Sequence, residues 1–445
     1  MLKNQPCDSA SNCLKTSCDY GIIYLSREVA FLTVIEFFDE TSIDNIESTL
    51  LHKPEKVIFI GNSPRKMKRS IVHYKRVTDA RGISVEFECI PVALGNLYDI
   101  VEKLAGIVET NPDCYFDICG GNELYLVALG VLEERYKEKV HLRTFRLAGE
   151  NGVETACDAG GCVRSEKKLE LSVEENVAVY GGRVIYTEEK GEGTVRRDYS
   201  DPHLRKDIAD TWEVCRFLGE RWNSIINCLD RVNKHCCDGN KVSVERNKRI
   251  KGVEEKEIRL IFDSDFLDIL RNIGIIHRLE REGDEVSFEY RNRNVKSMLT
   301  KAGLVLELAV ALTAYELCDY DGKKVYNDVV SGVYIDWDGE LNPRGEADVA
   351  NEIDVMLMKN TVPVFISCKN GSVDVNELYK LSQVAERFGG RYAKKVLVAS
   401  NLEKTGMAAE YIRVRAKDMN IRIVEDFDTA DKKEVERIFR TLHKN

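Results

Sequence analysis

The sequence contains no long hydrophobic run. Nowhere do its 445 residues form the stretch of about 20 apolar residues that a membrane-spanning helix requires. Residues 1–20 carry Lys3, Asp8, Lys15 and Asp19 and lack the apolar centre of a secretory signal peptide. We therefore expect a cytoplasmic protein that makes no contact with a membrane.

Cysteine is present, but the paired motifs that use it are missing. None of the 14 cysteines forms a Cys-x-x-Cys pair, which argues against a structural zinc site. Cys157 and Cys162 bracket a Gly-Gly pair, and other cysteines are scattered along the chain. Because disulfides are rare in the cytoplasm, we expect free thiols.

Positive charge is in deficit. The chain has 65 lysines and arginines against 75 aspartates and glutamates, so its formal net charge is −10. Such a protein repels nucleic acid at long range, and any nucleic-acid site must be a local basic surface, with a metal ion offsetting an acidic centre. The hydrophobic content of 43% and the charged content of 31% are ordinary for a soluble protein of two or three domains.

The first half lacks the common nucleotide-binding motifs. It has no Gly-x-Gly-x-x-Gly fingerprint and no Walker lysine, which argues against NAD binding and NTP hydrolysis. Strand and helix patterns alternate from residue 30 to residue 146, which predicts a mainly parallel, doubly wound α/β sheet.

Three predicted strands of this sheet end in glycine-bearing loops. The loops are Gly61-Asn62, Gly95-Asn96 and Gly120-Gly121-Asn122, and each precedes a predicted helix. Ligands of such sheets lie at the carboxyl ends of the strands, where helix N-termini offer free amides to phosphate. The loops therefore suit a sensor of phosphate-bearing ligands, although any α/β scaffold also needs such turns.

The middle of the chain predicts a connector that resembles a winged helix. Its expected elements are short strands at 176–180 and 183–187, a helix at 204–235, a strand at 257–262, a helix at 266–273 and a hairpin at 275–290. We interpret this region as a module coupling its neighbours rather than as a duplex-binding one, because the helix at 266–273 carries Asp268 and only one arginine.

A basic cluster follows this region and is the one nearest to the predicted active site. It consists of Arg291, Arg293, Lys296 and Lys301. These side chains are candidates for holding a phosphate backbone, and the alternative is a solvated surface.

A predicted hairpin at 351–370 carries the clearest chemical signal. Its strands are apolar, and polar side chains gather where it opens. A turn centred between Thr361 and Val362 sets Asp354 opposite Lys369, with Ser367 on the same face as Lys369. A carboxylate that holds Mg²⁺ or Mn²⁺ and a lysine that orients water are what phosphodiester hydrolysis requires. A charged pair at a hairpin mouth, without catalysis, is the alternative.

The predicted helix at 302–317 is almost wholly apolar, and Glu307 is the one charge between Ala302 and Tyr315. A buried carboxylate without a partner costs several kcal/mol, so such a residue is generally paired or bound to a metal ion. Glu307 is our second metal-site candidate, and a solvent-facing position is the alternative.

Two groups of residues resemble one known family. Asp117-x-x-Gly120-Gly121, together with Phe37-Phe38-Asp39-Glu40 and the strand 57–62, is similar to the signature of CARF domains. Asp354 and Lys369 resemble the PD-(D/E)XK nuclease pattern, in which Ser367 here takes the place of an acidic residue. Both motifs, in this order, resemble the CARF-domain PD-(D/E)XK nucleases of type III CRISPR systems.

This resemblance implies an α/β protein with an N-terminal extension (1–28), a Rossmann-like CARF sensor (29–150), a connector that is partly winged-helix-like (151–298) and a restriction-endonuclease-like nuclease domain (299–445). It implies a homodimer that binds cyclic oligoadenylate, usually the tetra-adenylate, and then cuts DNA (single-stranded, or by nicking duplex) and possibly RNA in antiviral defence. Mn²⁺ or Mg²⁺ would be held by Asp354, Glu307 and the Cys368 carbonyl, with Lys369 orienting water. The activator residues are then expected to be Asp39, Ser42, Gly61, Asn62, Ser63, Asn96, Gly120, Gly121, Asn122 and Glu123.

Two other functions remain open. Ser367 favours an oligoadenylate-responsive DNA-binding regulator with a degenerate nuclease domain. A ring nuclease that degrades its own activator is less favoured, because no histidine or other evident base lies in the glycine loops.

Overall fold

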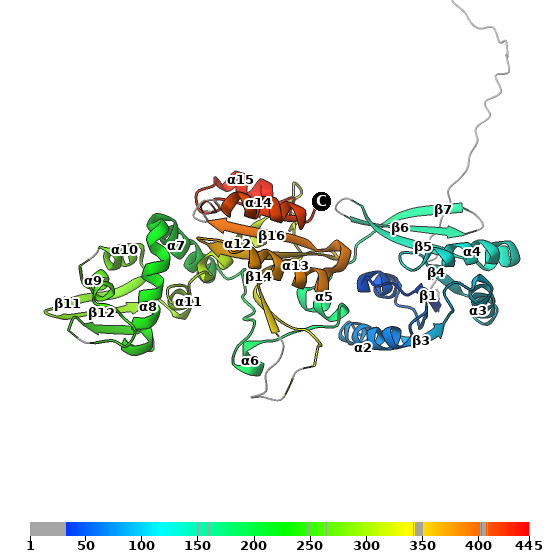
Figure 1. Ribbon diagram of the computed structural model, residues 1–445, viewed down its shortest axis with the longest axis horizontal. Coiled ribbons are helices and arrows are strands. Elements are labelled where there is room, and N and C mark those ends of the chain that lie inside the picture. The colour runs from blue at the N-terminus through cyan, green and yellow to red at the C-terminus, as the bar shows by residue number, and fades with distance from the viewer. Residues whose placement is uncertain are drawn as a thin grey trace, which may run out of the picture.

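A computed structural model describes residues 33–444, with gaps at 149–150, 159–160, 248, 264, 341, 343–349, 401, 403–405 and 407. The predicted extension over residues 1–28 therefore lies outside the described residues. Figure 1 shows three parts in a row. The N-terminal domain lies at one end, the C-terminal domain in the centre, and the connector at the far end. Within the described ranges, no helix is long and apolar enough to cross a membrane.

The N-terminal domain is built on a sheet of order β3-β2-β1-β4-β5-β6-β7. Strands β1 to β5 run parallel, and β6 and β7 continue the sheet antiparallel. The sheet ends at Lys167, beyond the predicted domain boundary at residue 150. The elements are β1 (Thr33–Phe37), η1 (Ser42–Asn45), α1 (Glu47–His52), β2 (Lys56–Gly61), α2 (Pro64–Ala80), β3 (Glu86–Pro91), α3 (Leu97–Thr110), β4 (Cys114–Asp117), α4 (Glu123–Tyr136), η2 (Lys137–Lys139), β5 (Leu142–Ala148), β6 (Asn151–Asp158) and β7 (Gly161–Lys167).

The strands of this sheet are apolar on both faces because helices cover both. Along β1, Val34 packs into one buried cluster while Ile35 and Phe37 pack into another on the opposite face. The cluster that contains Val34 continues into the C-terminal domain, where it includes Phe365 and Phe388. The two domains therefore share one continuous core rather than a hydrated gap.

A short linking segment fills this junction. It comprises α5 (Val173–Val179), β8 (Arg183–Val184) and α6 (Thr187–Lys190). The strand expected at 176–180 is instead helical, and Ser172 and Glu175 form a capping box at the start of α5. Strand β8 pairs with β13 and so belongs to the sheet of the C-terminal domain, although the connector was predicted to include it.

The connector has the predicted winged-helix order. A sheet of order β11-β12-β10-β9 packs beside the helices, and β11 and β12 form the expected hairpin. The strand expected at 257–262 is the helix α9. The elements are α7 (Pro202–Leu218), η3 (Gly219–Arg221), α8 (Trp222–Cys236), β9 (Cys237–Asp238), β10 (Lys241–Glu245), α9 (Glu255–Asp263), α10 (Phe266–Ile273), β11 (Ile276–Glu282), β12 (Glu285–Tyr290) and α11 (Arg293–Met298).

The connector does not lie between the other two domains (Figure 1). It lies on the side of the C-terminal domain that faces away from the N-terminal domain (Figure 1). Its apolar core is continuous with that of the C-terminal domain, through residues such as Trp222, Leu306 and Phe439. The connector is therefore attached to the C-terminal domain and does not stand between it and the N-terminal domain.

The C-terminal domain is organised around a sheet of order β17-β16-β15-β14-β13-β8. Helix α12 precedes the hairpin strands β13 to β15, and α13 crosses to the parallel strand β16, which is the predicted element order. The elements are α12 (Leu304–Glu316), β13 (Asp328–Asp336), β14 (Ala350–Lys359), β15 (Val362–Asn370), α13 (Val375–Gly389), η4 (Gly390–Tyr392), β16 (Lys394–Ser400), α14 (Ala408–Asp418), β17 (Ile421–Val424) and α15 (Lys432–Phe439).

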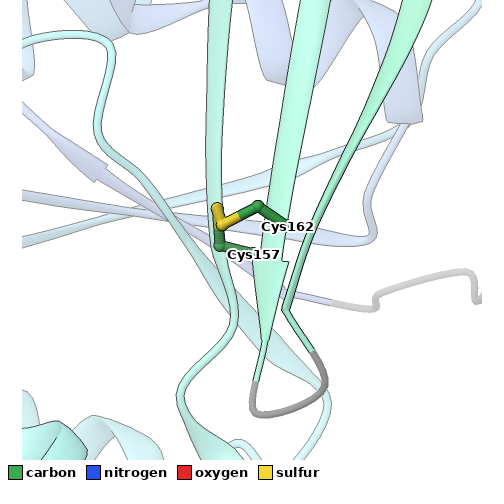
Figure 2. Close-up of a disulfide and its surroundings, with 2 residues drawn as sticks. All are labelled: Cys157 and Cys162. Carbon is green, nitrogen blue, oxygen red and sulfur yellow. A yellow bond between two sulfur atoms is a disulfide. The ribbon is translucent and has the colours of Figure 1, made fainter.

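One pair of cysteines departs from the expectation of free thiols. Cys157 and Cys162 face each other across the β6–β7 hairpin, with Cα atoms 4.1 Å apart, and form a disulfide (Figure 2). The antiparallel pairing of β6 and β7 sets the two residues opposite each other, which the spacing alone did not reveal. The expectation was wrong for this pair.

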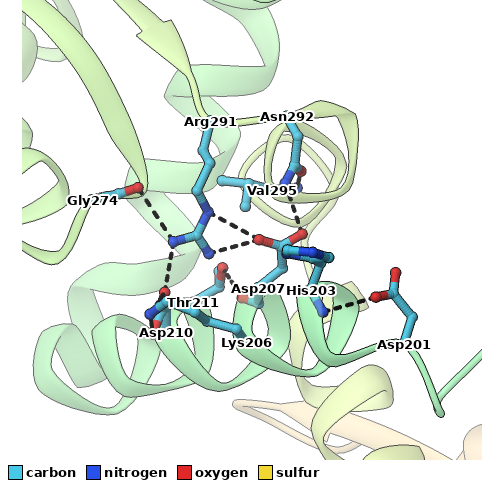
Figure 3. A network of polar contacts seen from close by, with 10 residues as sticks. All are labelled: Asp201, His203, Lys206, Asp207, Asp210, Thr211, Gly274, Arg291, Asn292 and Val295. Atoms are coloured by element: carbon cyan, nitrogen blue, oxygen red, sulfur yellow. Dashed lines mark hydrogen bonds and ion pairs between the residues drawn. The ribbon is translucent and has the colours of Figure 1, made fainter.

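The structure divides the predicted basic cluster after the connector: Arg293 and Lys301 are exposed, whereas Arg291 and Lys296 make contacts within the protein. Arg291 is mostly buried, and its guanidinium donates to Asp207 at 2.9 Å and to Asp210 at 2.7 Å (Figure 3). Lys296 donates to the carbonyl of Gly239 at 2.6 Å. Arg291 therefore holds α7 against the end of β12, and its charge is not available to a phosphate backbone.

Candidate functional site

The hairpin of β14 and β15 has a register two positions from the predicted one. Lys359 pairs with Val362, so the turn is Asn360-Thr361, and Asn360 adopts a left-handed φ of 57°. Asp354 consequently lies beside Ser367 and not opposite Lys369. The Ser367 hydroxyl donates to Asp354 Oδ2 at 3.2 Å, and the Cys368 amide donates to the same oxygen at 2.6 Å.

Lys369 still faces this carboxylate. Burial alone would lower the pKa of Lys369, but Asp354 and Glu377 outweigh it and hold that pKa above its usual value. The ammonium group lies 2.9 Å from Glu377, which stands in the first turn of α13 after the N-cap Asp374. The lysine is therefore protonated and fixed between a strand carboxylate and a helix carboxylate.

Glu307 joins the same cluster from α12. Burial, followed by the charges of Asp354 and Glu352, raises the pKa of Glu307 to about 8. Burial also raises the pKa of Asp354, although hydrogen bonds and Lys369 partly oppose the shift. The structure thus brings together Glu307, Asp354 and Lys369, the three predicted catalytic residues, and leaves Glu307 only partly exposed.

The stretch between α6 and α7 adds a cation, Arg197, that the sequence did not reveal. Arg197 donates to the hydroxyl of Ser331 at 3.1 Å, and its charge lowers the pKa of Glu307. Tyr199 donates to the same hydroxyl at 2.8 Å. No local pattern marks Arg197, because it reaches this strand from more than 130 residues earlier in the sequence.

The donor set suits a hard divalent cation. Glu307 and Asp354 are partly buried carboxylates whose pKa values are raised by burial, and the charge of Asp354 raises the pKa of Glu307 further. A cation held by both would oppose these shifts. In the described ranges, however, no three candidate ligands already stand together as a finished metal site. The Cys368 thiol is buried and its pKa is raised, so its side chain is not a ready ligand.

A second hollow lies at the junction of the N-terminal and C-terminal domains. It has a volume of about 360 Å³ and includes Asp39 and Ser42, two of the predicted activator residues. Its basic side chains are Lys66 and Arg69 from α2 and Arg387 from α13. Lys66 and Arg69 are one turn apart on α2, a spacing visible in the sequence but not used in the prediction. Arg387 comes from the other domain, and its approach depends on the tertiary fold.

Of the predicted activator residues, only Asp39 and Ser42 line this hollow. Asp39 accepts hydrogen bonds from the amides of Thr41 at 2.7 Å and Gly121 at 3.1 Å. Asn122 caps α4, and Asn96 caps α3 at a separate strand end. The remaining predicted residues, none of which lines the hollow, are Gly61, Asn62, Ser63, Gly120 and Glu123.

Gly121 allows a prediction about the switch point between β1 and β4. It has a φ of 95°, and a Cβ atom there would lie 2.5 Å from Phe37 Cβ. Gly95 has the same φ, but a Cβ atom there meets nothing within 4 Å. We expect Gly121→Ala to lower the free energy of unfolding by about 3 kcal/mol and Gly95→Ala by about 1 kcal/mol in urea titrations. Equal losses would mean that the loop relaxes around the methyl group.

Below the hollow, the two domains meet through a buried carboxylate. Arg391 donates to Asp44 at 2.6 Å and Tyr392 donates to it at 2.9 Å, and both come from η4. Burial still raises the pKa of Asp44 to about 7, with Arg391 opposing the shift. The loop that follows β1 is thus tied directly to the residues that follow α13.

Solved structures match this architecture. Protein VC1899 from Vibrio cholerae matches with a TM-score of 0.66 and 18% identity over 93% of this chain and 98% of that one. Can2 from Sulfobacillus thermosulfidooxidans, in complex with cyclic tetra-adenylate, matches with a TM-score of 0.59 and 13% identity over 94% and 99%. The chain has the fold of VC1899 and Can2. No protein-family model and no curated protein sequence matches it.

The shared fold extends over nearly the whole length of all three proteins. The predicted fold class is therefore confirmed: a Rossmann-like N-terminal domain, a winged-helix-like connector and a restriction-endonuclease-like C-terminal domain. The catalytic and binding roles of the predicted residues stay predictions.

Proposed function

We propose that this protein is a metal-dependent nuclease that cyclic oligoadenylate activates in CRISPR antiviral defence. The observation that carries the proposal is the convergence of Glu307, Asp354 and Lys369 at the mouth of the β14–β15 hairpin. It is supported by the fold shared with Can2, whose structure holds cyclic tetra-adenylate.

The chain's own residues divide the chemistry among themselves. Glu307 and Asp354 would hold Mn²⁺ or Mg²⁺, which when bound polarises the phosphodiester and lowers the pKa of water. Lys369 remains protonated, and its ammonium group would orient the attacking water and stabilise charge on the phosphate. Glu377 positions Lys369, and Ser331 positions Arg197, whose charge acts on Glu307.

The hollow beside Asp39 is the proposed activator site. Lys66, Arg69 and Arg387 provide the positive charge that phosphates require. A ring of four nucleotides is larger than a space of about 360 Å³, so we propose that a second copy completes the site about a two-fold axis. The protein would then act as a homodimer with cyclic tetra-adenylate as activator.

One observation favours a second function. Ser367 occupies the acidic position of the nuclease pattern, and no three candidate ligands stand together as a metal site among the described residues. An oligoadenylate-responsive regulator that binds DNA without cutting it would need neither an acidic residue at position 367 nor a metal site. Its distinguishing property is tight activator binding without hydrolysis.

Labelled single-stranded DNA, supercoiled plasmid and RNA, incubated with Mn²⁺ with and without cyclic tetra-adenylate, test both functions. We expect cleavage only when metal and activator are both present, and the product identifies the substrate. The Asp354→Asn variant should bind activator normally and cut nothing. Activator binding without cleavage by the unaltered protein would support the regulator, and cleavage indifferent to the activator would remove the sensor.

A further inference from the structure

The connector carries a concentration of positive charge that the proposed active site does not use. The loop between β10 and α9 reads Arg-Asn-Lys-Arg-Ile-Lys over residues 246–251. This run is the reverse of the overall balance of −10. A local basic surface of this kind is what an acidic protein needs in order to hold a polyanion.

The loop and helix α9 enclose a hollow of about 770 Å³. Arg246, Arg249 and Arg259 line it and are all exposed, and Glu255 is the one carboxylate among the described lining residues. Glu255 lies 2.5 Å from Arg259, and the lining residues comprise three arginines and this one carboxylate. Asn247, which also lines the hollow, donates to Asp284 at 3.0 Å.

The hollow has a firm apolar floor. Ile250 and Ile258 are each 6% exposed and belong to the core of the connector. The guanidinium of Arg246 lies over the ring of Phe262, 4.8 Å from its centroid. The arginines therefore stand on a packed surface, which reduces the entropy that each loses on binding a phosphate.

The recognition position of the winged helix is poorly suited to reading bases. On α10, Asp268 lies 3.0 Å from Arg271 and 2.7 Å from Arg281 of the hairpin strand β11. These pairs neutralise the side chains that would otherwise reach base edges. The positive charge lies instead on the β10–α9 side. Contacts from such arginines to a phosphate backbone carry no sequence information.

We propose that the hollow formed by Arg246, Arg249 and Arg259 binds the phosphate backbone of the nucleic-acid substrate without sequence preference. The N-terminal domain does not cover the connector, because the connector projects from the C-terminal domain away from it (Figure 1). The biological role of this site rests on the proposed nuclease function, but binding itself does not require cleavage. The connector is thus a substrate-holding domain rather than a coupling one.

Binding in EDTA separates this inference from catalysis. Fluorescence anisotropy with labelled single-stranded DNA, duplex DNA and RNA of two unrelated sequences each would be measured over a range of salt concentrations, using the full chain. The triple variant Arg246→Ala, Arg249→Ala, Arg259→Ala should bind on the order of tenfold more weakly, equally for both sequences. The slope of log K against log salt should fall by about 3, one for each arginine.

Two further variants are matched controls. Lys417→Ala, Lys433→Ala and Arg437→Ala remove the same charge from exposed positions on α14 and α15, and should leave the slope nearly unchanged. Replacing the three connector arginines with lysine keeps the charge and should restore most of the slope. An unchanged slope in the alanine variant, or an equal loss in the α14–α15 variant, would overturn the proposal. If the unaltered protein bound nucleic acid in EDTA but did not cleave it in Mn²⁺ with activator, the result would count against the proposed nuclease and leave this binding site in place.

Discussion

Lys369→Ala is expected to lower activator-dependent cleavage by a factor of about 10² to 10³, the loss seen when one fixed electrostatic donor is removed from an active site. The ammonium group of Lys369 is mostly buried and held 2.9 Å from Glu377. Lys380, which also contacts Glu377 at 3.1 Å, is not an equivalent group, because its side chain is 67% exposed.

Lys380→Ala is therefore the matched control for this experiment. It removes the same side chain from the same carboxylate and should change the cleavage rate by no more than a few-fold. Activator binding, measured by calorimetry, should be normal in both variants. If the two lysines gave equal losses, the effect would belong to Glu377 and α13 and not to Lys369 as a group acting on water or phosphate.

Glu307→Gln should have effects of opposite sign on stability and on activity. Burial raises the pKa of Glu307 from 4.5 to about 8, so the folded protein retains a proton there that the unfolded chain has lost. The stability that this proton provides is complete below pH 4.5 and is lost as the pH rises through 8. Glutamine has no such loss, and without metal the variant should melt roughly 5 °C higher at pH 8.

Added Mn²⁺ should reverse this order. The metal competes with the proton for Glu307, so its affinity for the unaltered protein should rise between pH 6 and pH 8 by about tenfold for each unit. Mn²⁺ should raise the melting temperature of the unaltered protein and not that of Glu307→Gln, whose cleavage should fall about a hundredfold or more. Glu316→Gln, at the exposed end of the same helix, should match the unaltered protein in every measurement. Metal stabilisation that survives Glu307→Gln would exclude Glu307 as a ligand.

The sequence was most informative where the pattern is periodic and long. Alternating strands and helices predicted the parallel sheet, and the isolated Glu307 in an apolar helix pointed to a carboxylate that the structure leaves only partly exposed. Short apolar runs were the failures, since α9 and α5 were both expected to be strands. Over so few residues, the period of a strand and that of a helix cannot be distinguished.

The active-site geometry was only partly predictable for a different reason. Asp354 and Lys369 were identified by residue type, but the turn at Asn360-Thr361 set a register that placed Ser367 beside Asp354. Glu377 reaches the cluster from α13, and Arg197 reaches it from the stretch between α6 and α7. Only the tertiary fold brings them there. Sequence reasoning identified the candidate residues Asp354 and Lys369 and missed Glu377 and Arg197, which contact or act on the candidate site.

Helix α13 has a mechanical consequence for the whole molecule. Its first turn carries Glu377, which contacts Lys369, and its last turn carries Arg387, which lines the hollow beside Asp39. At a rise of 1.5 Å for each residue, the ten residues between them span about 15 Å of stiff rod. A tilt of about 5° around one end moves the other by about 1.3 Å, which is comparable to the margin that separates a hydrogen bond from a broken one. Helix α13 therefore joins the candidate active site and the hollow beside Asp39 as one stiff element, so a tilt of the helix displaces a contact at both places.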